Sequence, residues 1–243
     1  MKIEIFGVGV DNDSWSEVTD KLEGFLSKGK KYYIVTPNPE MIVQAQKDEE
    51  FKKILSSSDL AIPDGVGLIW AAKVLNLDLK EKITGTDLAE KICELSAKKS
   101  YRIFFLGGKD NIGLRAKKNL EDRYPGLNIV GTDCGQASLK DEDRIIQKIN
   151  RNGPIDFLLV AFGAPKQEKW IVRNLDRLNV RVALGVGGAL DYFAKEKRRA
   201  PKWLRDRGLE WLFRLILEPK RIRRQARLPV FVYLILSRKL KSL

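Results

Sequence analysis

A carboxylate that could accept a proton stands at Asp64, which follows the short apolar run 60–62 after Pro63. The chain contains no histidine, which excludes a Ser-His-Asp or Cys-His nucleophile, a His-ligated zinc ion and an imidazole proton shuttle. Acid–base chemistry therefore falls to a carboxylate, a lysine, a tyrosine or a cysteine. We interpret Cys93 and Cys134 as ordinary reduced thiols, because two cysteines are too few for a disulfide framework in 243 residues.

Glycine and polar side chains gather in loops that lie between apolar runs and helical segments. These loops are 36–39, 63–67, 107–110, 163–168 and 185–188. Free backbone amides at the start of a helix bind anions, so the loops favour a phosphorylated ligand. The common nucleotide fingerprints are missing, because Asn12 stands where the last glycine of a GxGxxG motif would follow Gly7 and Gly9, and no GxxxxGK[ST] motif occurs. A standard dinucleotide oxidoreductase and a P-loop enzyme are therefore disfavoured.

The elements that must position these loops alternate along the chain. Strands are predicted over 3–6, 32–35, 60–62, 101–106, 128–130, 157–162 and 180–186. Amphipathic helices are predicted over 15–28, 40–55, 86–98, 111–123, 142–152 and 166–178. Strand followed by helix, repeated, predicts an α/β fold with a Rossmann-like, mostly parallel sheet and helices on both faces. Ligands of such sheets bind beyond the carboxyl ends of the strands, where these loops gather.

The positive charge of the chain is concentrated at its C-terminal end. The chain has 45 basic and 32 acidic residues, a net charge of +13, and 16 of the basic but only 4 of the acidic residues lie from Lys195 onward. The last 49 residues therefore carry a charge of +12, and the preceding part is nearly neutral. We expect an α/β catalytic domain at 1–195 and a basic, helical appendage at 196–243.

No segment of the sequence predicts a signal peptide or a membrane span. The longest apolar run, 229–236, is far shorter than the roughly 18 residues that a span needs. We therefore expect a cytoplasmic protein that meets a membrane from one side only. Asp11, Asn12 and Asp13 could supply oxygen ligands to a magnesium or manganese ion. The favoured interpretation is that Asp13 caps the helix that begins near Trp15, so no metal site is expected.

Five motifs carry a resemblance to a known family. They are TPNPEMIVQAQKDEEF, DLAIPDGVGLIWAAK, ITGTDLAEKI, FLLVAFGAPKQEKWI and GVGGALDYFA, followed by the basic segment RRAPKWLRDRGLEWLFRLILEPKRIRR. In this order and spacing, over about residues 6–224, the chain resembles the WecG/TagA/CpsF glycosyltransferases, glycosyltransferase family 26. It is most similar to the TagA-like N-acetylmannosaminyltransferases of teichoic acid linkage-unit synthesis.

The resemblance implies an inverting transfer of N-acetylmannosamine (ManNAc) from UDP-ManNAc to the 4-hydroxyl of GlcNAc in undecaprenyl-diphosphate-GlcNAc, with neither metal nor cofactor. Another UDP-sugar donor, such as UDP-ManNAc uronic acid, stays open as an alternative. Lys82 stands where the family usually has an arginine, which keeps the charge but loses the bidentate donor pair. The turn at 194–196 lacks the glycine that is usual in the family.

The resemblance also implies roles for individual residues. Inverting transfer requires a base that takes the proton of the acceptor hydroxyl, and the PDG motif assigns this role to Asp64. The alternative is that Asp64 forms an Asx turn or caps a helix at 66–74. Thr36 and Asn38 could bind sugar hydroxyls or the acetamido group, or form a plain turn with an asparagine cap. Thr86 could contact the ligand, although a helix cap is its leading interpretation.

Further candidate contacts come from the later motifs. The amide of Gln167 suits the sugar or the pyrophosphate, and Lys166 could either join it or lie on the surface. Gly187 and Gly188 allow a diphosphate or a uridine to approach the backbone, or else allow a helix to pack tightly. Asp191 could bind the ribose hydroxyls.

Three arginines of the appendage, Arg214, Arg221 and Arg224, are seven and three residues apart and share one face of a helix unless Pro219 breaks it. Their planar donors match phosphate oxygens. We expect the appendage to fold over the catalytic crevice and bind the diphosphate of the lipid substrate. A solvated basic helix is the alternative.

The segment 223–243 mixes basic residues with apolar and aromatic ones, which is typical of a peripheral contact with an anionic membrane surface. We therefore expect the protein at the inner face of the cell membrane. The same apolar side chains could instead be buried in a homo-oligomer. A nucleic-acid-binding protein would also use the basic tail, but it would leave the polar loops without a purpose, so no nucleic acid is expected as a partner. The apolar candidates are Leu228, Val230, Phe231, Tyr233, Leu234, Ile235 and Leu236.

Overall fold

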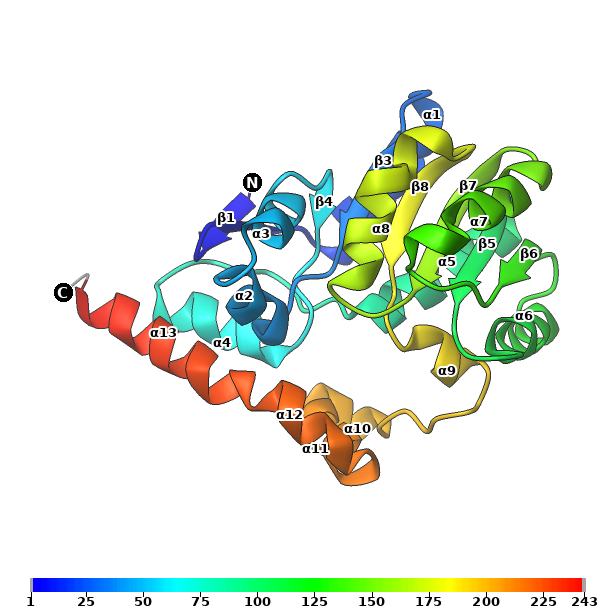
Figure 1. Cartoon of the computed structure of the whole chain (residues 1–243). Helices are drawn as coiled ribbons and strands as arrows, with labels where there is room; N and C mark the ends of the chain where they lie inside the picture. The colour runs from blue at the N-terminus through cyan, green and yellow to red at the C-terminus, as the bar shows by residue number, and fades with distance from the viewer. Residues whose placement is uncertain (1, 242–243) are drawn as a thin grey trace.

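A six-stranded parallel sheet forms the centre of the molecule in the computed structural model, which describes residues 2–241 (Figure 1). The predicted α/β fold with a parallel sheet is therefore confirmed. Across the sheet the strands follow the order β4 (Leu60–Ala61), β3 (Tyr32–Val35), β8 (Val180–Gly185), β7 (Ile155–Ala161), β5 (Arg102–Gly107) and β6 (Asn128–Asp133).

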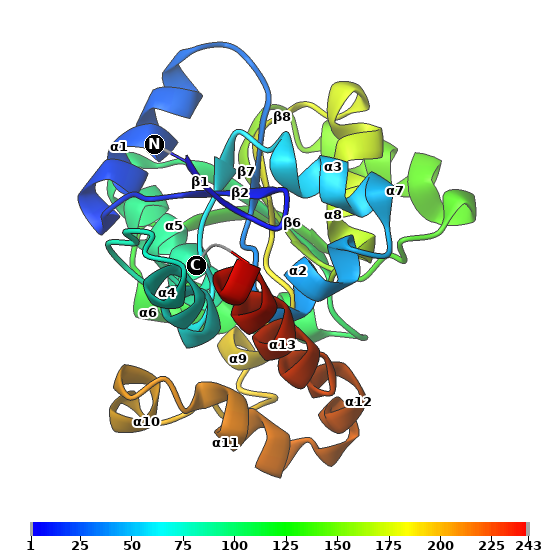
Figure 2. The ribbon, with the colours of Figure 1, turned by 90° about the vertical axis from the view of Figure 1, so that its left-hand side faces the viewer.

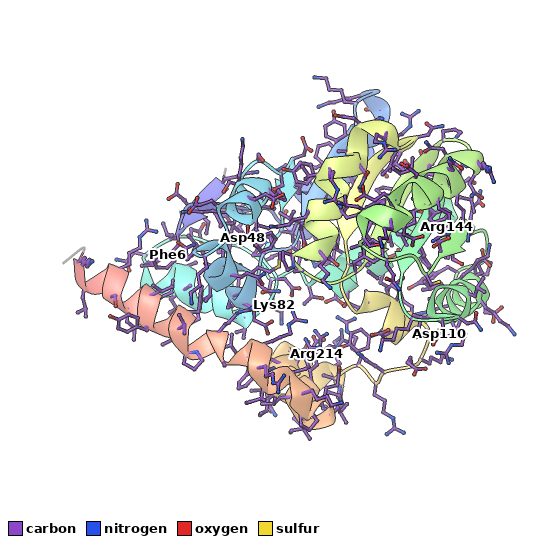
Figure 3. The ribbon with its side chains drawn as sticks, in the orientation of Figure 1. Phe6, Asp48, Lys82, Asp110, Arg144 and Arg214 are labelled. Atoms are coloured by element: carbon purple, nitrogen blue, oxygen red, sulfur yellow. The ribbon has the colours of Figure 1, made fainter. Side chains whose placement is uncertain are left out.

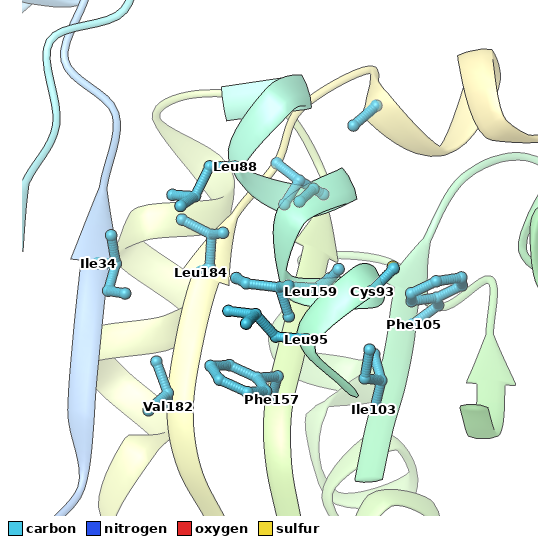
Figure 4. Packing of buried hydrophobic residues seen from close by; sticks show 14 of the residues in the cluster. Ile34, Leu88, Cys93, Leu95, Ile103, Phe105, Phe157, Leu159, Val182 and Leu184 are labelled. Atoms are coloured by element: carbon cyan, nitrogen blue, oxygen red, sulfur yellow. The ribbon is translucent and has the colours of Figure 1, made fainter. Parts of the chain in front are cut away.

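Central strands are apolar throughout because helices cover both faces of the sheet. Leu158 and Leu159 point to opposite faces of β7, and both are fully buried. On one face, α5 (Gly85–Lys99) packs its apolar side chains against the strands, and Leu88 and Cys93 belong to one buried cluster with Leu159 and Leu184 (Figure 4). The same core includes residues of α1 (Trp15–Ser27), α6 (Ile112–Arg123) and α9 (Ala189–Phe193).

The other face of the sheet is covered by α7 (Leu139–Arg151) and α8 (Lys166–Asn174), the latter continued by the 3-10 turn η1 (Leu175–Arg177). Trp170 of α8 is the largest fully buried side chain in this layer and packs edge-to-face against Phe162. The two cores clamp the sheet, so the loops at the carboxyl ends of its strands begin from fixed positions.

The N-terminal strand predicted over 3–6 does not join the parallel sheet. It forms β1 (Lys2–Ile5), which pairs antiparallel with β2 (Val8–Asp11) in a separate hairpin. The prediction missed β2 because the two turn residues, Phe6 and Gly7, both adopt positive φ angles of 54° and 76°, and a phenylalanine gives no signal for such a turn.

Two helix boundaries also differ from the prediction. The segment predicted as one helix over 40–55 is divided into α2 (Pro39–Ala45) and α3 (Glu49–Ser56), because Asp48 caps α3 through a bond from the Phe51 N–H. The expected cap at Asp13 is wrong, since Ser14 and Glu17 form a capping box at the start of α1.

The aspartates near the hairpin have structural partners. Asp13 pairs with Lys21, and Asp11 accepts a hydrogen bond of 2.8 Å from the Ala61 N–H, which ties the hairpin to β4. Within residues 2–241, no group of three or more His, Cys, Asp or Glu side chains is arranged to hold a metal ion.

The appendage leaves the body after α9 and returns to it through a long last helix (Figure 2). It comprises α10 (Lys202–Asp206), α11 (Glu210–Leu217), the 3-10 turn η2 (Pro219–Arg221), α12 (Ile222–Gln225) and α13 (Arg227–Lys241). In the part of the chain that the structure describes, no helix is both long and apolar enough to cross a membrane.

The last helix, α13, packs on α2 and on α4 (Val66–Val74). It buries Phe231 and Ile235 in a core shared with the hairpin and these two helices. The expectation that both side chains contact a membrane is therefore wrong, because they face the body. Other apolar side chains of α13 are exposed, namely Val230, Val232, Tyr233, Leu236 and Leu240.

Candidate active site

A cavity of about 1340 Å³ lies between the carboxyl ends of the strands and the appendage. It is larger than the roughly 300–1,000 Å³ that is usual for one small ligand, so it has room for parts of two substrates. The candidate residues that line it are Thr36, Asn38, Asp64, Thr86, Gln167, Gly187, Gly188, Asp191, Arg214, Arg221 and Arg224. Candidate residues that are far apart in the sequence thus line one cavity.

Asp64 lies in the loop between β4 and α4, and two backbone contacts hold it. Its own N–H donates to the carbonyl oxygen of Pro37 at 2.8 Å, and its Oδ2 accepts from the N–H of Gly85 at 3.4 Å. The N-cap of α4 is Gly65, with φ 91° and no capping side chain. Asp64 therefore does not cap α4, so the capping alternative is wrong, and Asp64 lines the cavity.

The surroundings of Asp64 raise the pKa of its carboxyl group to about 6. Burial is the main cause, because it disfavours the charged form, and the hydrogen bond from Gly85 opposes it. The nearby carboxylates of Glu210 and Asp87 raise the pKa further, while Arg214 lowers it. A carboxylate with a pKa just below neutrality is ionised at pH 7 and still accepts a proton readily, as a general base must.

Thr36 and Asn38 lie beside Asp64 on the loop after β3. The side-chain oxygen of Asn38 caps α2 by accepting from the N–H of Met41 at 3.0 Å. Its side-chain nitrogen has no hydrogen-bond partner among residues 2–241, so one end of the amide serves the fold and the other is available to a ligand. Gly85 allows α5 to begin next to Thr36, because a Cβ there would lie 3.1 Å from the threonine Oγ1.

The start of α5 separates the two threonines of its motif. Thr84 is the N-cap and accepts from the N–H of Asp87 at 3.1 Å. Thr86 lies inside the first turn and lines the cavity, so the capping interpretation of Thr86 is wrong. This position fits a contact with a ligand, which was the second interpretation of Thr86 from the sequence.

Gln167 lies at the start of α8, almost completely buried, behind the loops that follow β7 and β8. Its Oε1 accepts from the N–H groups of Gly163 and Gly187, both at 3.0 Å. Its Nε2 donates to Oε1 of Glu168 at 2.7 Å. Most of its hydrogen-bonding capacity thus serves the protein. Lys166 is exposed and does not line the cavity, so the structure does not bring it to the other candidates.

The loop after β8 presents its backbone to the cavity. Gly187 has φ 52°, and a Cβ there would meet open space, so the position is open to a ligand. A Cβ at Gly188 would lie 3.6 Å from Nη2 of Arg214, an ordinary contact distance, so Gly188 lies next to this arginine. Asp191 pairs with Lys197 at 3.0 Å, and Lys197 in turn pairs with Glu218 of the appendage at 3.1 Å.

The three arginines face the body from the opposite side. They belong to α11, η2 and α12 because the chain bends at Pro219, but all three line the same cavity. Arg214 lies on the side of α11 that faces the body (Figure 3). Its guanidinium carbon is 5.4 Å from the ring centre of Tyr192. Arg224 pairs with Glu40 at 3.0 Å.

Positive charge accumulates at this wall of the cavity. Arg221 is only partly balanced by Glu218 at 3.7 Å. Burial, followed by the neighbouring Arg214 and Arg224, lowers the pKa of Arg221. The repulsion of Arg221 by Arg214 and Arg224 would be relieved by a bound polyanion, because guanidinium groups match anionic oxygens in charge and geometry.

Sequence reasoning missed several residues of the site. Glu40 and Lys197 line the cavity and hold charged partners across it, and Trp70 of α4 adds an aromatic wall. Glu40 and Trp70 stand inside motifs that carried the resemblance, which was the available signal. Glu168 received no role, because a glutamate in the first turn of a helix is typical of a favourable interaction with the helix dipole. Lys82 also lines the cavity, and its ammonium donates to the carbonyl oxygen of Arg205 at 2.9 Å.

Comparison with known proteins gives the family of the chain. The family model described as "Glycosyl transferase WecG/TagA/CpsF family" matches residues 3–243, which include both the body and the appendage. The N-acetylglucosaminyldiphosphoundecaprenol N-acetyl-beta-D-mannosaminyltransferases of Staphylococcus aureus strains MRSA252 and NCTC 8325 are each 30% identical to the chain over 242 residues, 99% of this chain and 94% of theirs. The resemblance carried by the five motifs is thereby confirmed: the chain belongs to the WecG/TagA/CpsF family of glycosyltransferases.

Proposed function

We propose that the protein transfers N-acetylmannosamine from UDP-ManNAc to the 4-hydroxyl of GlcNAc in undecaprenyl-diphosphate-GlcNAc, as in teichoic acid linkage-unit synthesis, with inversion and without a metal ion. The observation that carries this proposal is that Asp64 and three arginines line one cavity from opposite sides. The names of the Staphylococcus aureus relatives describe the same acceptor and the same transferred sugar, which supports the assignment.

In the proposed reaction, the acceptor oxygen attacks the anomeric carbon of ManNAc from the side opposite to UDP. The carbon–oxygen bond to the β-phosphate breaks, and UDP leaves with the bonding electron pair. The hydroxyl proton passes to the carboxylate of Asp64, whose pKa of about 6 keeps it ionised at neutral pH. Attack from the opposite side inverts the anomeric configuration.

The remaining cavity residues divide between the two substrates in this proposal. The appendage arginines, Arg214, Arg221 and Arg224, bind the diphosphate of the acceptor, because guanidinium groups match phosphate oxygens in charge and geometry. Thr36, Asn38 and Thr86 contact the sugar, and the open backbone at Gly187 and Gly188 receives the donor diphosphate or uridine. Asp191, which Lys197 holds, is placed for the ribose hydroxyls.

The appendage also fits a role at the membrane in this proposal. Its helices expose apolar side chains beside basic ones, including Trp203 at 57% exposure and Ile216 at 69%. Such a surface binds the headgroup region of an anionic leaflet, where a polyprenyl-linked acceptor resides. We therefore assign residues 1–195 to catalysis and residues 196–243 to the diphosphate and the inner face of the membrane. Self-association through the same apolar residues is the alternative.

A panel of UDP-sugars tests the proposal directly. The chain is incubated with a short-chain lipid-diphosphate-GlcNAc and labelled UDP-ManNAc, UDP-ManNAc uronic acid, UDP-GlcNAc or UDP-glucose, each with and without EDTA. We expect transfer from UDP-ManNAc alone, unaffected by EDTA, to a disaccharide whose β-linkage NMR identifies. Preference for the uronic acid would establish the alternative donor, and loss of transfer in EDTA that added metal restores would overturn the metal-free mechanism.

A further inference from the structure

A buried carboxyl group stands directly behind the cavity and takes no part in the mechanism above. The side chain of Glu168 is 1% exposed and does not line the cavity. Its Oε1 accepts the hydrogen bond from Nε2 of Gln167, and its Oε2 is buried with no hydrogen-bond partner within residues 2–241. A carboxyl group placed in this way costs free energy of folding, so its presence calls for an explanation other than stability.

The neighbour of Glu168 joins two loops of the cavity. Gln167 accepts two backbone N–H groups with the same oxygen, one from Gly163 after β7 and one from Gly187 after β8. Both donors are backbone groups, so the amide oxygen must face them and the amide nitrogen must face Glu168. By accepting from the amide nitrogen of Gln167, the carboxyl group of Glu168 opposes a flip of the amide. The amide oxygen therefore stays turned toward the two loop N–H groups.

The sheet makes room for this arrangement at Gly185, the last residue of β8. A Cβ at Gly185 would lie 2.5 Å from Nε2 of Gln167 and 2.9 Å from Oε1 of Glu168. Any larger residue at this position would push both side chains out of place. The two polar side chains of α8 therefore occupy a space that the strand leaves free for them.

We propose that Glu168 is a positioning residue of the transferase: it holds the amide of Gln167 in one orientation and, through it, holds the loops after β7 and β8 in the shape of the cavity. The inference rests on the proposed function, since the loops matter there for binding the donor. It requires no contact between Glu168 and a substrate. Gln167 accordingly acts as a link between the loops more than as a ligand contact.

The strength of this link depends on the charge of Glu168. Burial raises the pKa of Glu168 to about 7, against the opposing hydrogen bonds from Gln167 and from a backbone N–H. The ionised carboxylate accepts the stronger, charge-assisted bond. The link is therefore firmest above pH 7 and weakens as the pH falls below it.

Charged groups around α8 are engaged elsewhere. On α8 itself, Lys166 is exposed. Lys169 pairs with Asp48 and Glu50, which stand at the start of α3. Other ionisable groups on the packed elements also have their own partners: Tyr33 of β3 donates to the Ile54 carbonyl, Asp156 of β7 accepts from the Arg102 N–H, Arg181 of β8 lies near Asp156, and Arg177 of η1 pairs with Asp143.

NMR of the backbone amides tests the link without any transfer reaction. In the wild-type chain, the amide signals of Gly163 and Gly187 should shift with pH with a midpoint near 7. Glu168→Gln keeps the shape and removes the charge, so this midpoint should vanish. Glu142→Gln serves as the matched control, because Glu142 is a buried glutamate that pairs with Arg173 away from the cavity, and it should retain the midpoint. Persistence of the midpoint in Glu168→Gln would overturn the inference.

Kinetics separate positioning from simple stability. At pH 8, kcat/KM of Glu168→Gln should be about threefold to tenfold below the wild type, and the two should converge near pH 6, where the wild-type group is neutral. Glu168→Leu removes the hydrogen-bond acceptor altogether. Its kcat/KM should be at least about tenfold below the wild type at both pH values, and its Tm should be unchanged or higher. Wild-type kcat/KM in Glu168→Leu would contradict the role. If the NMR results hold while no sugar is transferred by any variant, the proposed function fails and the link stands.

Discussion

The two sides of the cavity are held in place by different forces. On the body side, the loops continue buried strands and are fixed by backbone hydrogen bonds, such as Asp64 N–H to the Pro37 carbonyl and Val186 N–H to the Val160 carbonyl, both at 2.8 Å. On the appendage side, the arginines stand on short helices whose described residues are all at least partly exposed except Gln225. Ion pairs with the body, such as Arg224 with Glu40, hold this side.

A different chemistry suits each side of the cavity. The proposed proton transfer to Asp64 needs a fixed geometry, and the backbone hydrogen bonds of the body side hold the loop of Asp64 in place. Binding a diphosphate requires charges that can exchange one anionic partner for another, and Glu40 and Glu218 hold Arg224 and Arg221 as a phosphate would. The buried Phe231 of α13 anchors the far end of the appendage, and polar contacts such as that of Lys82 with the Arg205 carbonyl tie α10–α12 to the body. The wall of the cavity formed by α10–α12 is called the suspended side, and the wall formed by the loops after the strands is called the packed side.

The sharpest test of the packed side is Asp64→Asn, which removes the base and keeps its shape. We expect kcat to fall by about 10²–10⁴-fold. The wild-type kcat/KM should rise by about tenfold per pH unit below 6 and level off above it, because the ionised form is active, and the variant should lack this rise. Burial raises the pKa of Asp64, so its contribution to the stability of the fold is present at low pH and is lost as the pH rises from about 4 to 6. Asp64→Asn should therefore melt at an equal or higher temperature than the wild type at pH 8.

Asp133 offers the matched control, because it also stands at the carboxyl end of a strand. It is buried at the end of β6, which by itself would raise its pKa, but its pairs with Arg144 and Lys148, both at 2.8 Å, hold that pKa well below the usual range. It therefore stabilises the fold at neutral pH, and this contribution is lost as pH falls through its low folded-state pKa. Asp133→Asn should lower the Tm and leave kcat near the wild-type value. An equal loss of activity in both variants would show that Asp64 acts through the fold.

The sequence predicted the packed side better than the suspended side. Asp64, Thr36 and Gln167 follow apolar strands, and parallel strands bring such residues to one edge of a sheet. The direction in which Phe231 of α13 faces was missed, because an apolar and basic stretch has the same composition whether it faces a membrane or a core. The second strand was also missed, since its turn depends on a phenylalanine with a positive φ.

The roles inside the site were harder to predict than its membership. A glutamine at the start of a helix favours the prediction of a ligand contact. The oxygen of Gln167 instead accepts from the backbone N–H groups of two loops, one after β7 and one after β8. The three arginines line one cavity, but they occupy three elements and not the single helix face that their spacing predicted. Hydrogen bonds between distant segments are set by tertiary packing, which the local pattern of a sequence does not contain.

The suspended side is tested by Arg221→Ala, for which we expect a fall in kcat/KM of about tenfold to a hundredfold, mostly through KM for the lipid acceptor. Arg221→Lys should recover only part of the loss, because an ammonium keeps the charge but not the bidentate geometry. Arg223→Ala is the control on the neighbouring helix, since Arg223 is exposed and does not line the cavity. An acceptor KM unaffected by Arg221→Ala would place the diphosphate elsewhere.

The junction between the two sides provides a smaller effect. Arg199 pairs with Asp87 at 2.7 Å and lies 3.9 Å from Glu210, and both carboxylates raise the pKa of Asp64. Arg199→Ala removes a positive charge beside these two carboxylates, so the pKa of Asp64 should rise. The midpoint of the kcat/KM profile should then move to a higher pH, and kcat/KM at pH 7 should fall by a few fold. Asp87→Asn should move the midpoint to a lower pH. Midpoints that move in the same direction would contradict this electrostatic coupling.

The smallest catalytic effect is expected at the outer surface of α13, where Val230 and Leu240 are 45% and 72% exposed and lie outside the cavity lining. The double variant Val230→Ser, Leu240→Ser should retain activity on a water-soluble, short-chain acceptor and bind anionic vesicles about tenfold more weakly in flotation, because apolar burial in the headgroup region is lost. Phe231→Ser on the inner surface should instead lower the Tm. Unchanged vesicle binding together with a smaller species in sedimentation would assign the outer surface to self-association, and the suspended side would then depend on a second copy of the chain.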